Sequence, residues 1–273
     1  MDALDHLGWV VHRSYEIGRM QFGVRTNSEA CGEWLDETFS EYRIDDETAP
    51  YLSLLVADGD NGRVGKRFHI LYEESRALVR THDLRLAGEM LLAQFEHLQA
   101  SERSDRIYVD AGVVRLGDVV GLVPPILPPY LGTLGHRVIE RAGLELPLST
   151  FVAIDAESGR VVPPQRTLHV PADALDRLAE IHPGDGRERR GAVDGPIDVD
   201  VVCFIGLAEE PVRTYSPGRA AHLLATRTLN LDQIGGGALE GVGRLVEKAR
   251  CYEIQSSRPK ATLEALVRAL QPA

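Results

Sequence analysis

The spacing of the apolar residues changes repeatedly along this chain, and this change constrains the possible folds more than any other feature of the sequence. Short apolar runs typical of β-strands alternate with stretches in which apolar residues recur every three or four positions, as on one face of an α-helix. The longest helical stretch carries Leu84, Ala87, Leu91, Phe95 and Leu98. Strand-like runs precede and follow it, so the sequence predicts an α/β protein with several short strands.

A polar segment, SERSDR at residues 101–106, follows this helical stretch and predicts the boundary between two domains. We expect a smaller N-terminal α+β domain over residues 1–103 and a larger α/β domain over residues 104–273. Within the second domain, residues 183–196 are rich in Gly, Arg and Asp and predict an exposed, flexible loop.

The N-terminal domain is expected to contain one helix that begins after Asn27 or Ser28, because either side chain can cap it. Trp34 and Phe39 belong to the apolar face of this helix and are expected to pack inside the domain. The strands expected in this domain are residues 7–13, 21–24, 52–57, 67–73 and 77–80.

In the second domain, two strand-like runs at residues 107–114 and 118–123 precede a proline-rich loop at residues 124–133. A helix that ends at Gly143 and a strand at residues 151–154 follow the loop. The order strand, loop, helix, strand predicts a parallel βαβ unit with a right-handed crossover. The later elements expected are a buried strand at residues 199–207, a helix capped by Ser216, helices around residues 239–249 and 263–270, and a strand at residues 252–255.

The charge balance excludes one class of partner. The chain has 41 acidic and 30 basic residues and a formal net charge of −11, so it lacks the positive stripe that nucleic-acid backbones require. No stretch reaches the roughly 20 apolar residues of a membrane-spanning helix, and no basic signal-peptide region follows Met1. We therefore expect a cytoplasmic protein that binds neither nucleic acid nor membranes. Its three cysteines are far apart and are expected to be buried, reduced thiols.

Several pieces of the chain carry a family resemblance. They are DAGVVRLGDVVGLVP at residues 110–124, ERAG at 140–143, FVAIDAESGRVVPPQR at 151–166, EEPVRTYSPGRAAHLLATRTLN at 209–230 and CYEIQ at 251–255. With them, most of residues 107–270 resembles the HPr kinase/phosphorylase-related proteins, and FGVRTNSEACGEWLDETF at residues 22–39 is similar to their leading domain. The resemblance implies a P-loop-kinase-like core of the kind formed by the C-terminal part of HPr kinase.

A kinase of this family needs a phosphate-binding loop with glycines, a lysine and a hydroxyl group that ligates magnesium. The corresponding loop here carries Pro124, Pro125, Pro128 and Pro129, which have no backbone N–H. The resemblance aligns Gly132 and Thr133 with the lysine and serine of the family. The lysine is therefore missing.

The acidic residues of the family are also mostly missing. The resemblance aligns Leu148, Ser149 and Thr150 with its paired carboxylates and leaves Asp155 as the one acidic residue of that segment. We therefore expect a vestigial pocket with no catalytic residue, metal ligand or cofactor. Its expected members are Pro125, Pro128, Gly132, Thr133, His136, Ser149, Thr150 and Asp155. His169 is a further candidate, although single histidines are more often surface or packed imidazoles.

These features favour a pseudokinase-like binding protein over an enzyme. The resemblance implies a role in bacterial ribosomal-peptide (RiPP) biosynthesis, with a precursor peptide or a tailoring enzyme as partner and with assembly into an oligomer or a heterocomplex. An exposed sheet edge in the N-terminal domain could receive the peptide by strand addition. Two alternatives stay open: a divergent ATP-dependent kinase or transferase that uses Thr133, His136 and Asp155, and a structural subunit that stabilises a neighbouring enzyme.

Overall fold

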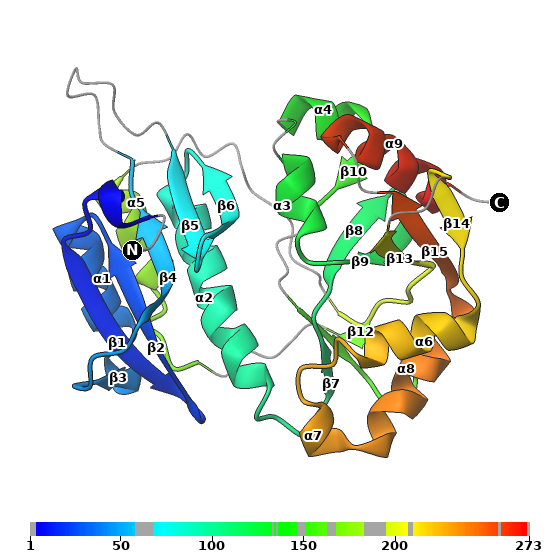
Figure 1. The fold of residues 1–273 in the computed structure, drawn as a ribbon, viewed down its shortest axis with the longest axis horizontal. Coiled ribbons are helices and arrows are strands. Elements are labelled where there is room, and N and C mark those ends of the chain that lie inside the picture. The colour runs from blue at the N-terminus through cyan, green and yellow to red at the C-terminus, as the bar shows by residue number, and fades with distance from the viewer. Residues whose placement is uncertain are drawn as a thin grey trace. The chain divides into compact units, whose positions relative to one another are not determined.

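The protein has an α/β architecture, seen in a computed structural model. The structure describes residues 4–57, 68–132, 134, 136–146, 151–162, 168–182, 195–206, 210–255 and 258–271, except for the side chains of Pro129 and His136. The chain divides into two compact units (Figure 1). Unit 1 comprises Met1–Gln99 and Arg166–Arg189, and unit 2 comprises Ala100–Gln165 and Arg190–Ala273.

Unit 1 is built on a six-stranded sheet. Its strands are β1 (Val11–Ile17), β2 (Met20–Thr26), β3 (Arg43–Ile44), β4 (Pro50–Leu55), β5 (His69–Glu73) and β6 (Arg76–Thr81). They lie in the order β3-β1-β2-β4-β5-β6. Only β2 and β4 pair in parallel; the other neighbours are antiparallel.

The first strand begins later than the sequence predicts. Residues Asp5–Leu7 form a 3-10 turn (η1), and Gly8 follows with a φ of 74°. Neither the 3-10 turn nor a left-handed glycine has the extended backbone of a strand. The strand therefore starts only at Val11 rather than at residue 7. The expected strands at residues 21–24, 52–57, 67–73 and 77–80 correspond to β2, β4, β5 and β6.

The described residues of unit 1 also form three helices, α1 (Glu29–Thr38), α2 (Leu84–Ala100) and α5 (Ala174–Ile181), with a short turn η2 (Ser40–Tyr42) after α1. The Ser28 hydroxyl accepts a hydrogen bond from the Cys31 N–H at 3.3 Å, which confirms the expected helix cap. Trp34 and Phe39 are buried, and the rings of Phe39 and Phe95 stack with centroids 3.9 Å apart. The aromatic core therefore joins α1 and α2.

The division of the chain differs from the predicted domains, because residues 166–189 belong to unit 1 rather than to a continuous second domain. Helix α5 contacts α1, and the Trp34 indole donates a hydrogen bond to the Ala174 carbonyl at 2.7 Å. Leu178 is fully buried, and a Cβ atom added at Gly88 would lie only 2.1 Å from one of its methyl carbons. Burial of this apolar face explains why the segment returns to the first unit.

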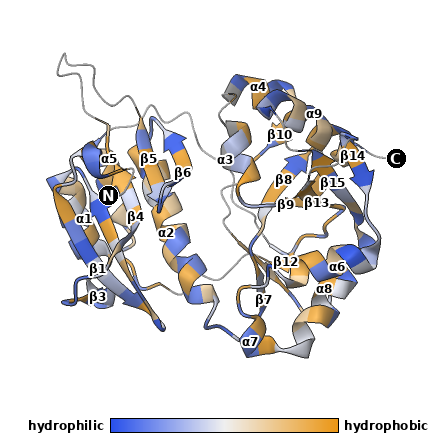
Figure 2. Cartoon of the chain, viewed as in Figure 1, coloured by the Kyte–Doolittle hydropathy of each residue, from blue (hydrophilic) through white to orange (hydrophobic). Residues whose placement is uncertain are grey.

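Unit 2 contains a second six-stranded sheet. Its strands are β8 (Gly112–Leu116), β9 (Val119–Val123), β10 (Leu144–Glu145), β13 (Val201–Gly206), β14 (Val212–Thr214) and β15 (Arg250–Gln255), in the order β10-β8-β9-β13-β15-β14. The pairs β9–β13 and β13–β15 are parallel and the others are antiparallel. The central strand β13 is largely hydrophobic (Figure 2), as expected for a strand that is covered on both faces.

Helices cover both faces of this sheet (Figure 1). One buried cluster contains residues of α6 (Pro217–Ala225) and α8 (Gly236–Lys248), and another contains residues of α3 (Leu127–Gly132), α4 (His136–Arg141) and α9 (Pro259–Leu270). A short helix, α7 (Leu231–Ile234), precedes α8. The expected cap is confirmed, since the Ser216 hydroxyl accepts a hydrogen bond from the Arg219 N–H at 3.4 Å. None of the described helices has both the length and the apolar composition needed to cross a membrane.

A small sheet in unit 2 corrects two predictions. It consists of β12 (Val161–Val162), β11 (Val152–Ile154) and β7 (Ile107–Val109), all antiparallel. The single strand expected at residues 107–114 breaks at Asp110 and contributes β7 and β8 to different sheets. The expected parallel βαβ unit is also wrong, because β11 pairs with β7 and β12, whereas the parallel neighbour of β9 is β13.

The proline-rich stretch at residues 124–133, expected to be a loop, contains helix α3. Pro128 and Pro129 stand in its first turn, where helical N–H groups have no partner inside the helix, so proline is tolerated there. The expected flexible loop at residues 183–196 lies mostly outside the described residues.

Candidate functional site

The candidate site is the segment between β9 and α3, where the resemblance places a phosphate-binding loop. Four of the residues 124–130 are prolines without an N–H group. The Leu127 N–H donates to the Pro124 carbonyl at 2.9 Å, and the Tyr130 N–H donates to the Ile126 carbonyl at 3.1 Å. Within these residues, only the N–H of Ile126 is left to meet a ligand.

Apolar side chains anchor this segment. Leu127 and Leu131 are fully buried in one cluster with Val123, Ile139 and Leu266. Ile126, by contrast, is 42% exposed. The segment therefore serves the hydrophobic core on one side and presents an apolar residue, rather than a row of N–H donors, on the other.

The structure places only part of the predicted pocket. Pro125 is half-buried and Pro128 is buried, while Gly132 ends α3 and His136 begins α4. Thr133, Ser149 and Thr150 lie outside the described residues. These assignments leave Pro125, Pro128 and Asp155 as pocket residues with described side chains.

Asp155 lies on a different side of unit 2 from the proline segment. It follows β11, whose Ile154 packs into the cluster of α6 and α8, whereas Leu127 packs into the cluster of α9. The turn after Asp155 also rests on α8, since a Cβ atom at Gly159 would lie 2.9 Å from the Leu245 nitrogen. The structure thus does not bring Asp155 and the proline segment together.

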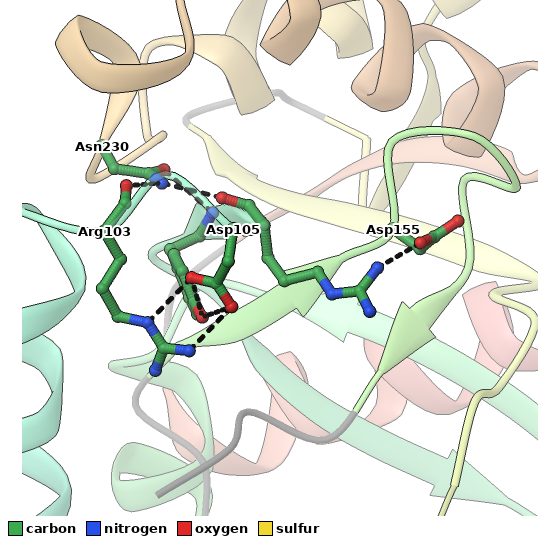
Figure 3. Close-up of polar contacts among 6 residues, drawn as sticks. Arg103, Asp105, Asp155 and Asn230 are labelled. Carbon is green, nitrogen blue, oxygen red and sulfur yellow. Dashed lines mark hydrogen bonds and ion pairs between the residues drawn. The ribbon is translucent and has the colours of Figure 1, made fainter. Parts of the chain in front are cut away.

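Contacts within this turn occupy the carboxylate of Asp155. Its Oδ1 accepts hydrogen bonds from the Ser158 N–H at 2.9 Å and from the Ser158 hydroxyl at 2.7 Å. The Arg106 guanidinium forms an ion pair with Oδ2 (Figure 3). The hydrogen bonds from Ser158, together with Arg106, hold the pKa of the Asp155 carboxyl below its ordinary value. The carboxylate closes a turn.

Next to this turn lies the buried amide of Asn230, a residue that was not predicted from the sequence. Asn230 is 1% exposed; its Oδ1 accepts from the Tyr108 N–H at 3.0 Å, and its Nδ2 donates to the carbonyls of Arg103 and Arg106 at 2.6 and 2.7 Å (Figure 3). Asparagine is common in loops, so no sequence pattern distinguishes a buried, structural asparagine from an exposed one. Asn230 fixes the start of β7.

Asp105 completes the polar network around β7. Its carboxylate pairs with the Arg103 guanidinium at 2.8 Å and accepts from the Tyr108 hydroxyl at 3.1 Å. Arg103 lowers the pKa of the Asp105 carboxyl, and burial raises the pKa of the Tyr108 phenol. Each residue drawn in Figure 3 thus has at least one partner among the others, which is typical of structural support.

Two histidines with described side chains, His169 and His69, have their contacts within unit 1. His169, a candidate for the pocket, lies in unit 1. Its backbone N–H donates a hydrogen bond to the Tyr42 hydroxyl at 2.9 Å, and its ring Nδ1 lies 3.4 Å from a carboxylate oxygen of Glu41. His69 is fully buried in unit 1, and its Nδ1 accepts from the Ala57 N–H at 3.1 Å. Burial lowers the pKa of His69 to about 4. Among the described residues, no group of three or more His, Cys, Asp or Glu side chains is placed to hold a metal ion.

The three thiols are buried and free, as the sequence predicts. Burial raises the pKa values of Cys31, Cys203 and Cys251 to about 11, 12 and 11. Thiols in such surroundings stay protonated and are poor nucleophiles.

Comparison with known proteins adds no assignment. No family model matches the sequence, and no curated protein matches it either.

Proposed function

We propose that this chain is a non-catalytic binding protein on an HPr-kinase-like scaffold and that its partner is another protein or a peptide. One observation carries the proposal: in residues 124–130 the prolines lack N–H groups, and the N–H groups of Leu127 and Tyr130 bond within the segment. A loop with one remaining N–H and no lysine cannot cradle a triphosphate.

The energetic consequence is large. Hydrogen bonds to charged groups contribute about 1.5–3 kcal/mol each, so the loss of three of them weakens binding by a factor of roughly 2,000 or more. Asp155 does not compensate, because Ser158 and Arg106 already engage its carboxylate. Phosphoryl transfer needs the same contacts in its transition state and is lost with them.

The finer part of the proposal rests on the family resemblance. It assigns unit 2 to an HPr-kinase-like core and assigns the partner to bacterial ribosomal-peptide biosynthesis, as a precursor peptide or a tailoring enzyme. Support comes from the parallel strands β9, β13 and β15 with helices on both faces, and from the position of the matching pieces on β8, β9, α4, β11 and α6.

The test is a calorimetric titration of the full chain with Mg-ATP, run beside an active P-loop kinase as positive control. We expect no heat of binding up to millimolar nucleotide for this chain. Binding at micromolar concentration would overturn the proposal in favour of a divergent kinase.

Co-purification with the proteins encoded beside this chain tests the partner. Capture of a precursor peptide, or of an enzyme that folds by itself, agrees with the proposal. An enzyme that is insoluble alone but active in the complex would assign the role of a structural subunit instead.

A further inference from the structure

In the described part of the chain, most of the strands at the edges of the sheets are short or are covered by other residues. Strands β3, β10 and β12 have two residues each, and β14 has three. The outer side of β7 is bonded to residues 227–229, through the Tyr108 carbonyl at 2.8 Å and the Asp110 N–H at 2.9 Å. Strand β6, with six residues, ends the sheet of unit 1 and has no further strand beside it among the described residues. We call its outer side the β6 edge.

The β6 edge is held rigidly by the core. Leu78, Val79 and Thr81 are 8%, 5% and 1% exposed, whereas Arg76 and Arg80 are exposed. A strand with buried side chains keeps its extended conformation before a ligand arrives. An incoming segment then loses only its own conformational freedom.

A β-bulge determines which side chains share a face of this edge. Ala77 pairs with Tyr72 and Arg80 pairs with Ile70, with a register shift between Leu71 and Tyr72. Tyr72 and Ile70 are two residues apart in β5 and so lie on one face, which places Ala77 and Arg80 on that face despite their odd spacing.

Aromatic rings gather beside Arg80. Its guanidinium lies 3.8 Å from the centroid of the Phe68 ring, and the rings of Phe68 and His82 lie 4.3 Å apart. A guanidinium held over an aromatic ring can still donate its N–H groups to a carboxylate. A carboxylate on an added strand would find a preorganised donor there.

The charge beside the β6 edge favours an acidic partner. Arg76 pairs with Glu73 in the ladder, so it lies on the face opposite Arg80, and Glu73 already forms an ion pair with it. Arg80 is exposed on the other face. Opposite charges on neighbouring strands stabilise a strand pair, whereas like charges destabilise it, so the edge is suited to an acidic strand.

We propose that the β6 edge binds an extended acidic segment of a partner peptide by strand addition, with backbone hydrogen bonds to β6 and a carboxylate against Arg80. This inference rests on the proposed function, since it names the surface and the class of peptide for the same binding role.

The test uses the full chain and a fluorescein-labelled probe of roughly ten residues in which Glu and Val alternate. Two further probes carry N-methyl groups on the odd or on the even backbone amides. Since only every second amide of an added strand faces β6, we expect one methylated probe to lose affinity by about tenfold or more and the other to retain it. Equal affinities for the two methylated probes would overturn strand addition.

Charge reversal tests the acidic preference. Arg80→Glu is expected to weaken binding of the Glu-Val probe by about tenfold and to allow binding of a matching Lys-Val probe. The matched control is Arg19→Glu, in the turn between β1 and β2 of the same unit, which is expected to leave both affinities unchanged. Unchanged binding by Arg80→Glu would overturn the inference.

The two proposals fail in different ways. Neither peptide measurement involves a nucleotide, so micromolar Mg-ATP affinity would overturn the proposed function alone. Failure of the Glu-Val probe to bind, together with no response to Mg-ATP, would overturn the β6 edge as the binding surface and leave the binding role itself intact.

Discussion

Buried polar residues explain how the start of unit 2 is fixed. Asn230 bonds to one N–H and two carbonyl groups of residues 103–108, which lie more than a hundred positions earlier in the chain. A side-chain amide suits this place because it offers an acceptor and two donors at once. No aliphatic residue of similar size can satisfy these three backbone groups.

We expect Asn230→Ala to lower the free energy of unfolding of unit 2 by about 3 kcal/mol, because it leaves buried backbone groups without partners. Hydrogen exchange at the β7 amides measures this change. The matched control, Gln233→Ala, alters an exposed side chain of α7 and should change it by less than about 0.5 kcal/mol. Equal effects of the two variants would contradict the structural role of Asn230.

His69 makes the stability of unit 1 depend on pH. Its pKa is lowered from 6.5 to about 4, chiefly by burial and further by His182 and His82. Between these values the unfolded chain binds more protons than the folded chain. The stabilisation is therefore complete above pH 6.5 and is lost as the pH falls through this window.

The expected loss between neutral pH and pH 4 is about 3 kcal/mol for this one group. Urea unfolding followed by tryptophan fluorescence measures it, because both tryptophans, Trp9 and Trp34, belong to unit 1. Carboxylates titrate in the same range, so the relevant quantity is the difference from His69→Gln. A variant with the same pH dependence as the natural chain would refute this assignment.

At the scale of elements, local signals predicted more than long-range ones. The apolar face of α2 and the caps Ser28 and Ser216 depend on residues within a few positions, and all three are confirmed. The break between β7 and β8, and the antiparallel position of β11, depend on which distant strand offers a partner. Nothing in the apolar run at residues 107–114 encodes that choice.

Two helices were missed although the sequence contained a signal for them. Leu127 and Leu131 are four residues apart, and the prolines between them stand where a first helical turn accepts them. In α5, Ala174 and Leu178 have the same spacing. In both segments, turn-forming or charged residues beside the apolar pair made the helix hard to recognise from the sequence. Each pair stabilises its helix through burial against distant parts of the chain.

The turn between β11 and β12 shows how closely two elements meet. Gly159 has a φ of 70°, and an added Cβ atom would lie 2.9 Å from the Leu245 nitrogen of α8. Gly117, in the turn between β8 and β9, has a φ of 58° with nothing within 4 Å. The two glycines share a backbone conformation and differ in their surroundings.

We expect Gly117→Ala to cost about 1 kcal/mol of unfolding free energy for the left-handed conformation alone. Gly159→Ala should cost about 3 kcal/mol, because backbone atoms of α8 must also move. Urea unfolding followed by far-UV circular dichroism compares the two variants. Equal costs would show that the turn does not rest on α8.

At the scale of the whole molecule, the chain leaves unit 1 after α2 and returns to it with α5. The sequence marks the first crossing with the polar segment at residues 101–106 but gives no comparable sign of the second. The site was likewise predicted without any sign of which distant segments pack together. Its residues were joined by sequence resemblance, whereas the structure packs Ile154 and Leu127 in different clusters of unit 2.

The return of α5 can be tested with two buried leucines that belong to different units. Leu178 in α5 and Leu266 in α9 are both fully buried, so either change to alanine should cost about 2–5 kcal/mol. We expect Leu178→Ala to shift the tryptophan-detected unfolding of unit 1 and to leave hydrogen exchange in β13 unchanged. Leu266→Ala should do the reverse, because its side chain packs in the cluster of Cys203 in β13. If Leu178→Ala instead weakened protection in β13 and left the tryptophan signal unchanged, α5 would belong to unit 2, as the continuous second domain predicted from the sequence requires.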